Sequence, residues 1–141
     1  MPYWPPGDIR PLRSRAGDIV STSGSSGANP RPLRVLLVIT RGERGGAQVH
    51  VRDLLAGLKH RVDYHLIVGE TGFVTEEADR LGVPCEVMPS LQRAVSPRTD
   101  ARALRALVRA IDAVKPHLVH THSTKAGLLG RLAARIRGVP V

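Results

Sequence analysis

The sequence is poor in cysteine, aromatic residues and long apolar runs, and each shortage excludes a class of protein. A single cysteine, Cys85, rules out an intrachain disulfide and a cysteine-rich zinc module, and suits a reducing compartment such as the cytoplasm. Aromatic residues make up only 3% of the chain, so stacking platforms for single-stranded nucleic acid are nearly absent. The longest apolar run, Val35 to Ile39, is far shorter than the roughly 18 residues of a membrane-spanning helix.

The charge balance is strongly basic, with a net charge of +9 and only three lysines among the 21 basic residues. Such a charge suits nucleic acid, an anionic membrane surface or a phosphorylated ligand, and it equally suits a solvated basic surface. The basic residues are scattered along the chain, and no nucleic-acid-binding motif is present. We therefore expect no nucleic-acid partner.

The 141 residues divide into two parts of different composition. Residues 1–32 hold six of the 11 prolines and the tract Ser21 to Pro30, which is rich in serine and glycine. Such a segment cannot bury enough apolar surface to offset its ordering entropy, so the sequence predicts a disordered leader over 1–32. It contains no continuous apolar stretch of the kind found in signal peptides. One folded domain is expected over 33–141, a length that supports a real core.

Strand and helix patterns alternate through this domain. Strands are expected over 33–39, 64–68, 83–88 and 117–121, and a fifth begins at 139–141. Helices are expected over 47–59 and 75–81, then from an N-cap at Asp100 to Pro116, and finally around 128–136 with Gly138 as its C-cap. Alternation of this kind predicts an α/β, Rossmann-like, doubly wound parallel sheet with strand order 3-2-1-4 and the fifth strand next.

Apolar residues at helical spacing predict which helix faces are buried. The first helix carries such a stripe at positions 47, 51, 54, 55 and 58. The last helix carries one at Leu128, Leu129, Leu132, Ala133 and Ile136. Cys85 is expected to be a buried small side chain of the third strand.

In this strand order the first and fourth strands are neighbours, and a ligand crevice opens at their carboxyl ends. The loop after the first strand contains Gly42, Gly45 and Gly46, which allow close backbone approach to a ligand. The helix that starts near Ala47 points free amides into the crevice, where a phosphate would fit. The spacing matches neither the dinucleotide nor the P-loop fingerprint, and a tight turn with no ligand remains an equal alternative.

The loop after the fourth strand reads HTHSTKAG, from His120 to Gly127. His120 and His122 project to one face because side chains alternate along a strand. Ser123 or Thr124 is placed to cap the next helix, and Lys125 adds positive charge at its start. Two imidazoles there suit proton transfer or a hydroxylated ligand, although both rings could merely satisfy loop carbonyls.

A metal would need further ligands beyond this His-x-His pair, and none is evident in the sequence, so no metal is expected. The histidines at positions 50, 60 and 65 lie on or near surface elements and receive no role.

Residues 33–141 resemble the N-terminal half of a GT-B glycosyltransferase of the subfamily-4-like type, and we expect this half to be incomplete, truncated at its C-terminal end. The resemblance is carried by RVLLVI, GGAQVHVRDLLAGL, LGVPCEVMPSLQRAVSPRTDARALRAL and, most specifically, KPHLVHTHSTKAGLLGRLAARIRGVPV. It implies transfer of a sugar from a nucleotide-sugar donor to a glycan or lipid-linked acceptor, in surface polysaccharide biosynthesis. The nucleotide-sugar is then a substrate, and no cofactor is implied.

The resemblance also implies roles for particular residues. Gly45, Gly46 and Ala47 would approach the donor phosphates, and His122 would lie near the reacting sugar and act as the catalytic residue. His120, Ser123 and Lys125 would be supporting contacts on the acceptor side.

Such enzymes have a second domain that binds the nucleotide and carries a Glu-x7-Glu pair, which this sequence lacks. We therefore expect the chain alone to be inactive, and the enzyme to be cytoplasmic with peripheral contact at the inner membrane face. Two alternatives remain open from the sequence: a non-catalytic module for a phosphorylated ligand, and a basic protein that binds nucleic acid or a membrane surface.

Overall fold

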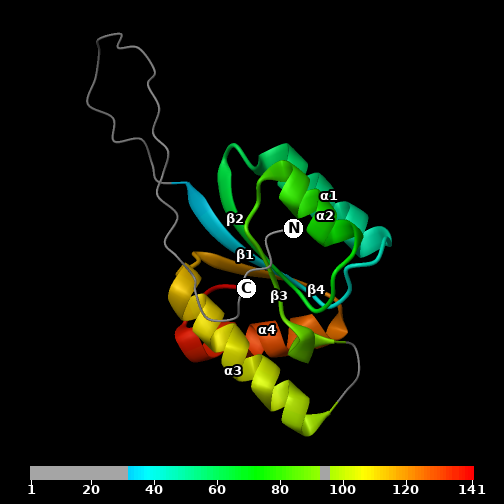
Figure 1. Cartoon of the computed structure of the whole chain (residues 1–141). Helices are drawn as coiled ribbons and strands as arrows, with labels where there is room; N and C mark the ends of the chain where they lie inside the picture. Colours follow the sequence, from blue (N-terminus) through cyan, green and yellow to red (C-terminus); the bar gives the residue numbers. More distant parts are fainter. Residues whose placement is uncertain (1–31, 93–95) are drawn as a thin grey trace, which may run out of the picture. The chain divides into compact units, whose positions relative to one another are not determined.

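Strands and helices alternate along the chain in the computed structural model, which describes residues 32–92 and 96–141 (Figure 1). The elements in chain order are β1 (Leu33–Ile39), α1 (Gly46–Leu58), β2 (Val62–Val68), α2 (Phe73–Leu81), β3 (Cys85–Val87), a 3₁₀ turn η1 (Pro89–Leu91), α3 (Pro97–Val114), β4 (Leu118–His122) and α4 (Thr124–Arg137). Each predicted strand and helix up to α4 is therefore present. The bounds of β1 are those predicted, and most other bounds differ by one or two residues at one or both ends. The starts of α3 and α4 lie about four residues earlier than predicted. The leader predicted over 1–32 lies almost wholly outside the described residues.

The four strands form one parallel sheet in the order β3-β2-β1-β4, as the sequence predicts. β1 lies between β2 and β4, and its last five residues are buried. Its sequence, LRVLLVI, is aliphatic almost throughout because both faces of an internal parallel strand are covered.

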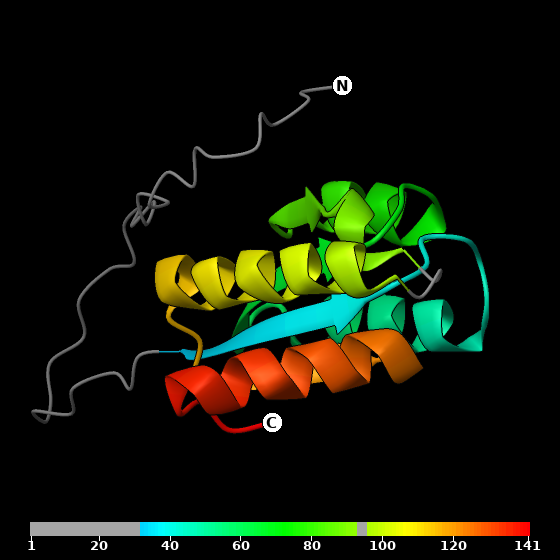
Figure 2. The same ribbon diagram turned by 90° about the horizontal axis from the view of Figure 1, so that it is seen from below.

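Two apolar layers cover the two faces of the sheet. Val35, Leu37 and Ile39 of β1 pack with α1 and α2, whereas Leu36 and Val38 pack with α3, α4 and η1. Figure 1 shows α1 and α2 on one side of the strands and α3 and α4 on the other. α3 and α4 lie side by side in Figure 2, and the two helices are in contact.

Helix ends follow local sequence in two cases and depart from it in a third. Gly82 and Gly138 end α2 and α4 in the left-handed conformation, with φ of 68° and 67°, so the Gly138 cap is confirmed. The N-cap predicted at Asp100 is wrong, because α3 begins earlier, at Pro97, with Ser96 as its N-cap. Proline suits a first helical position, where its missing N–H is not needed. The Asp100 carboxylate still accepts a hydrogen bond from the Ser96 amide at 3.3 Å.

The predicted buried stripes need correction at their margins. Ala47 is exposed at the start of α1, where Gln48 is buried instead. In α4, Leu128, Leu132 and Ile136 are 69%, 42% and 50% exposed. The buried face of α4 consists instead of small residues with one leucine: Ala126, Leu129, Gly130, Ala133 and Ala134. Small side chains on this face let the helix lie close to the sheet, and the larger side chains at 128, 132 and 136 therefore face outward.

The predicted fifth strand is not formed over 139–141, although one backbone hydrogen bond joins this segment to β4. The Val119 amide donates a hydrogen bond to the Pro140 carbonyl at 2.9 Å, so the segment runs next to β4. Cys85 lies in β3 as expected, partly rather than fully buried, and its desolvation raises the pKa of the thiol to about 12. A thiol in that state is unreactive.

Candidate functional site

The carboxyl ends of β1 and β4 bring the two histidines of the HTH motif together. His120 is paired with Leu37 and His122 with Ile39 in the parallel register. Leu37 and Ile39 pack toward α1 and α2, and residues paired in register share a face of the sheet. Both imidazoles therefore lie on the α1 face, with ring centroids 4.4 Å apart. The shared face is what the sequence spacing predicts.

A third imidazole joins this pair from α1. The centroid of the His50 ring lies 5.6 Å from that of His122, in an edge-to-face arrangement. The sequence analysis gave His50 no role, and the structure places this exposed residue with its ring next to His122. The helical position could have indicated this, because His50 is the fifth residue of the helix that begins at the crevice and precedes buried Val51.

The surroundings disfavour positive charge on the rings of the HTH motif. Burial lowers the pKa of His122 to about 4, and the neighbouring His120 and His50 add repulsion. Burial also lowers the pKa of His120, again with a contribution from His50. At neutral pH both rings are uncharged, and each then carries one N–H donor and one nitrogen acceptor.

One nitrogen of this cluster has no partner. His122 Nε2 is buried and makes no hydrogen bond to any of the described residues. A buried polar atom without a partner costs free energy unless a ligand or water satisfies it. Within residues 32–92 and 96–141, no group of three or more His, Cys, Asp or Glu side chains is arranged to hold a metal ion. The arrangement suits hydrogen bonding to a ligand hydroxyl.

The loops after β1 and β4 are joined by a side-chain hydrogen bond. The hydroxyl of Thr40, which is buried, donates to Ser123 Oγ at 2.9 Å. Ser123 occupies the N-cap position of α4, but its side chain makes no capping bond, contrary to one of the two caps expected there. Its φ of 86° lies in the region that favours glycine. The two loops are thereby held in one arrangement at the crevice.

The glycines of the loop after β1 occur at their positions for different structural reasons. A Cβ at Gly42 would lie 2.4 Å from the Glu70 carbonyl oxygen, so Gly42 is needed for packing against the loop before α2. A Cβ at Gly46, the first residue of α1, would meet nothing within 4 Å. Gly45 is the N-cap of α1 and its backbone is extended. A Cβ at Gly45 would lie 2.8 Å from Gln48 Oε1, so the open direction is that of Gly46. No side chain forms a capping hydrogen bond at this helix start.

Gln48 supports this loop from the first turn of α1. Its side chain is buried and its Nε2 donates to the Arg41 carbonyl at 3.1 Å. The sequence analysis did not single out Gln48 or Thr40, although a polar residue inside an apolar helix stripe is a signal of such a contact.

Lys125 differs in placement from the expectation of a crevice cation. Its Nζ lies 2.6 Å from Asp100 Oδ1 and donates to the Gln92 carbonyl at 2.6 Å, and its side chain is only 10% exposed. Lys125 therefore ties the start of α4 to the start of α3.

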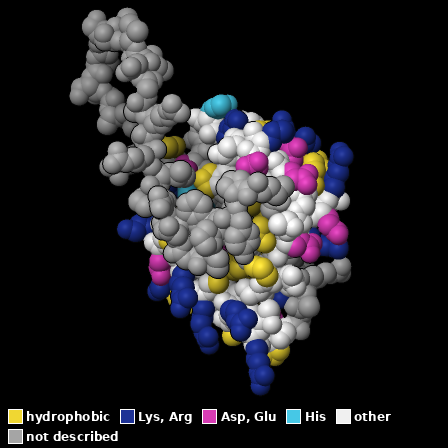
Figure 3. Space-filling view, in the orientation of Figure 1, with side chains coloured by type: hydrophobic (Ala, Val, Ile, Leu, Met, Phe, Trp, Pro, Cys, Tyr) yellow, Lys and Arg dark blue, Asp and Glu magenta, His cyan; other side chains and the backbone are white. Residues whose placement is uncertain are grey.

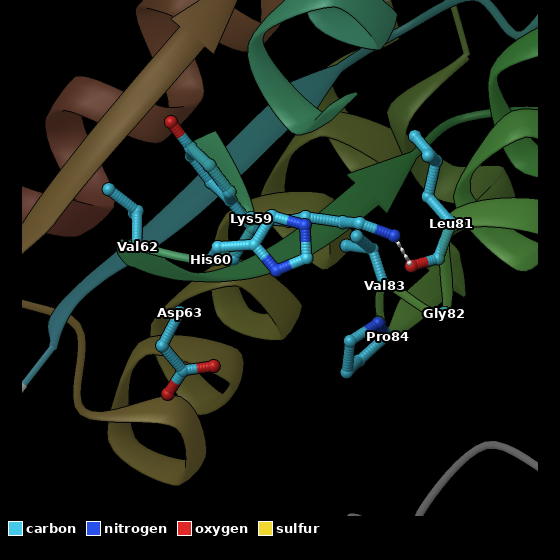
Figure 4. A pocket seen from close by; sticks show the side chains of 9 residues that line it. Lys59, His60, Val62, Asp63, Leu81, Gly82, Val83 and Pro84 are labelled. Carbon is cyan, nitrogen blue, oxygen red and sulfur yellow. Dashed lines mark hydrogen bonds between the residues drawn. The ribbon is translucent and has the colours of Figure 1, made fainter. Parts of the chain in front are cut away.

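A separate pocket lies at the other end of the sheet, where α1 and α2 end and β2 begins (Figure 4). Lys59, His60 and Asp63 are among its lining residues, and Lys59 Nζ donates to the Leu81 carbonyl at 3.2 Å. This bond ties α1 to α2. The pocket lies away from the HTH motif and the glycine loop.

The parallel sheet, its strand order and the helices on both faces define an α/β, Rossmann-like fold that matches part of GT-B glycosyltransferases. Residues 45–141 match the family model described as "Glycosyl transferase 4-like domain", and the chain belongs to this family. No helix among the described residues is long and apolar enough to cross a membrane.

A curated relative from Escherichia coli is 35% identical over 106 residues, which cover 67% of this chain and 27% of the relative. It is named UDP-Gal:alpha-D-GlcNAc-diphosphoundecaprenol alpha-1,3-galactosyltransferase. The chain thus spans about a quarter of the length of that protein.

Solved structures show the same fold at lower identity. Acinetobacter baumannii MurG is 18% identical with a TM-score of 0.62, over 78% of this chain and 34% of MurG. Anabaena HepE in complex with UDP-glucose is 18% identical with a TM-score of 0.57, over 77% of this chain and 28% of HepE. At these identities the likeness supports the fold alone.

Proposed function

We propose that residues 33–141 are the acceptor-side domain of a glycosyltransferase that moves a sugar from a nucleotide-sugar donor to a glycan or lipid-linked acceptor. The family of the chain supports this, as does the name of the E. coli relative, which includes a UDP-sugar and a diphosphoundecaprenol acceptor. The observation that carries the proposal is the contact of the His120–His122 pair with His50 of α1, the helix that follows the glycine loop. Surface polysaccharide biosynthesis is the process we propose for the enzyme.

The two loops would contact different parts of the donor, the loop after β1 its phosphates and the loop after β4 its sugar. The backbone at Gly45, Gly46 and Ala47 would approach the donor phosphates, since amides at a helix start favour an anion. His122 would hydrogen-bond a sugar hydroxyl near the reacting carbon through its unpartnered Nε2. An uncharged imidazole suits this task better than an imidazolium, because it can accept a proton as well as donate one.

His120 and Ser123 would support the acceptor side, and Lys125 would add positive charge from the start of α4. A second α/β domain would bind the nucleotide and stabilise the leaving diphosphate, which is a principal lever in such chemistry. The nucleotide-sugar is a substrate in this scheme, and we propose no further cofactor.

We also propose peripheral contact of this domain with an anionic membrane surface at the cytoplasmic side. Arg98, Arg102, Arg105 and Arg109 are exposed and recur at helical spacing along α3. None of the four has an ion-pair partner in the part of the chain that the structure describes. Figure 3 shows lysine and arginine side chains gathered over the lower part of the molecule, where α3 lies.

Apolar side chains lie next to these arginines. Ile136 of α4 lines a shallow groove together with Leu104 and Val108 of α3, and Leu128 and Leu132 continue the exposed apolar stripe along α4. A basic surface with apolar side chains between the charges suits an anionic bilayer. A lipid-linked acceptor would be met at that bilayer.

The test is a transfer assay with UDP-sugars and a diphospholipid acceptor, on a chimera that joins residues 33–141 to the C-terminal part of the E. coli relative. His122→Ala should lower kcat at least about a hundredfold while the unfolding midpoint changes little, since general acid–base or positioning contacts contribute on this scale. The chain alone should transfer sugar at a far lower rate than the chimera. The proposal fails if the folded His122→Ala chimera keeps normal turnover, or if ligand binds without any transfer.

A further inference from the structure

The three imidazoles of the crevice form one hydrogen-bonding surface built from two elements. His120 and His122 come from the end of β4, and His50 comes from the second turn of α1. The centroid of the His122 ring lies 4.4 Å from that of His120 and 5.6 Å from that of His50. A single pyranose ring with its hydroxyl groups is wide enough to meet two imidazoles at such separations.

We infer that His50 is a third ligand-binding side chain of the crevice, and that the three imidazoles together bind the hydroxyl groups of a sugar ring. This inference rests on the proposed function and adds to it a residue and the chemistry that the residue recognises. Its first support is geometric, because His50 is exposed at the crevice end of α1 and is no part of the apolar core that α1 builds with Val51 and Leu55. The core therefore gives no reason for an imidazole at this position.

Charge is the second support. None of the three rings forms a salt bridge with an acidic side chain in the described part of the chain; the His65–Asp63 pair lies on β2. An uncharged imidazole matches a hydroxyl well, because each has one donor and can accept. The ammonium of Lys125, at the start of α4, forms an ion pair with Asp100 and donates to the Gln92 carbonyl. The cluster thus suits a polyhydroxylated, uncharged part of a ligand, and the phosphates belong at the start of α1.

The unpartnered Nε2 of His122 is the third support. The nitrogen is buried, and the centroid of the His122 ring lies 4.4 Å from that of His120 and 5.6 Å from that of His50. A ligand hydroxyl that bonds to this nitrogen would therefore lie next to the other two imidazoles.

A sugar ring could come from the donor or from the acceptor, and two pairs of probes separate these sources. The donor arm compares UDP-glucose with UDP. The acceptor arm compares N-acetylglucosamine 1-phosphate with inorganic phosphate. In each arm the difference in affinity between the two probes reports the sugar alone. Binding is followed on the 141-residue chain by NMR of the histidine ring protons, which detects weak complexes and reports on each imidazole.

In one arm the sugar-bearing probe should shift the resonances of all three rings and bind more tightly than its sugar-free control. His50→Ala should remove about five- to tenfold of that gain, the worth of one hydrogen bond, while the affinity for the sugar-free control stays unchanged. His50→Gln should keep part of the gain because its amide also donates and accepts. His60→Ala, an exposed histidine at the opposite end of the sheet, is the matched control and should behave as wild type.

The arm that shows the gain identifies the sugar as donor or acceptor. If His50→Ala keeps the full gain while His122→Ala loses it, the inference about His50 is overturned and the proposed function stands. If neither sugar-bearing probe gains over its control and no histidine resonance moves, both the inference and the proposed site are wrong. Since His50 is exposed, the variant should keep the wild-type fold, which the remaining amide spectrum checks.

Discussion

The Thr40 hydroxyl donates a hydrogen bond to Ser123 Oγ at 2.9 Å, across 83 residues of sequence. Thr40 follows β1 and Ser123 follows β4, so this bond joins the two loops that form the crevice. It takes the side chain of Ser123 away from capping α4, and it holds Ser123 in a backbone conformation that favours glycine. Strain of this kind persists where surrounding contacts over-determine it.

The Thr40–Ser123 bond should contribute to stability. Thr40→Val keeps the shape of the side chain and removes its donor, so the free energy of unfolding should fall by about 1 kcal/mol or more. Thr40→Ser keeps the hydroxyl and serves as the control, with a smaller loss from its missing methyl group. Urea unfolding measures both. Equal stability of wild type and Thr40→Val would show that the bond contributes nothing.

The low pKa of His122 gives the protein a stability that depends on pH. His122 has a folded pKa of about 4, below the ordinary value of 6.5. Between these values the unfolded chain binds more protons than the folded chain, so the free energy of unfolding falls as pH falls from about 6.5 toward 4. NMR titration of the His122 ring should give its midpoint directly.

A variant without this imidazole should lose part of that dependence. His122→Asn should show a smaller drop in the free energy of unfolding between pH 7 and pH 5 than wild type shows in urea titrations. A His122→Asn profile parallel to that of wild type would contradict the low pKa.

Gly130 should be intolerant of a side chain because α4 lies close to the sheet there. A Cβ at this position would lie 2.6 Å from Thr121 Cγ2, and Thr121 is a short, β-branched side chain of β4. Gly130→Ala should therefore cost about 1–3 kcal/mol in stability. Adding Thr121→Ser removes the clashing methyl and should restore part of the loss.

The matched control is Gly57→Ala in α1, where a Cβ would meet nothing within 4 Å. This variant should gain up to about 1 kcal/mol, because alanine favours a helix over glycine. Thermal unfolding of the two variants tests the pair. Similar effects of the two substitutions would argue against close packing at Gly130.

Substitutions at Gly42 and Gly46 should have different effects: one should lower stability and the other should lower affinity for the donor. Gly46→Val adds a side chain where the crevice is open, so the fold should survive while the Kd for UDP-glucose rises at least about tenfold through loss of close backbone approach. Gly42→Ala should instead destabilise the fold, because its Cβ would meet the Glu70 carbonyl. Unchanged affinity of Gly46→Val would exclude the loop from donor binding.

The arginine stripe of α3 should direct binding to anionic vesicles. Arg105→Gln combined with Arg109→Gln should weaken binding to phosphatidylglycerol-containing vesicles about ten- to thirtyfold, at about 1 kcal/mol per charge. Arg61→Gln combined with Arg80→Gln removes the same charge from exposed positions outside α3 and should have a smaller effect. If the wild-type protein binds neutral phosphatidylcholine vesicles as tightly as anionic vesicles, or if salt does not weaken the binding, the membrane proposal is wrong.

Local patterns predicted the layout of this domain well where one residue type dominated. The aliphatic run of β1 and the Gly138 cap were confirmed because each has a single low-energy local solution. The shared face of His120 and His122 followed from strand alternation alone. The N-cap was wrongly predicted at Asp100 because Pro97 suits the first helical position better. The Asp100 carboxylate instead forms an ion pair with Lys125.

Contacts between distant segments could not be predicted in the same way. The spacing of Leu128, Leu132 and Ile136 equally fits a buried stripe, and only the close approach of α4 at Gly130 turned it outward. His50 resembled an ordinary surface histidine until α1 was placed against β4.

The sequence by itself determined the alternation of strands and helices, the strand order and the family, because these depend on local periodicity and on motifs read within one segment. The tertiary structure alone decided which further side chains contact those that the sequence had placed at the ends of β1 and β4. Thr40 meets Ser123 and His50 meets His122 only because parallel pairing brings the ends of β1 and β4 together and packs α1 over them. Such contacts depend on distances between segments far apart in the chain, and no local pattern contains those distances.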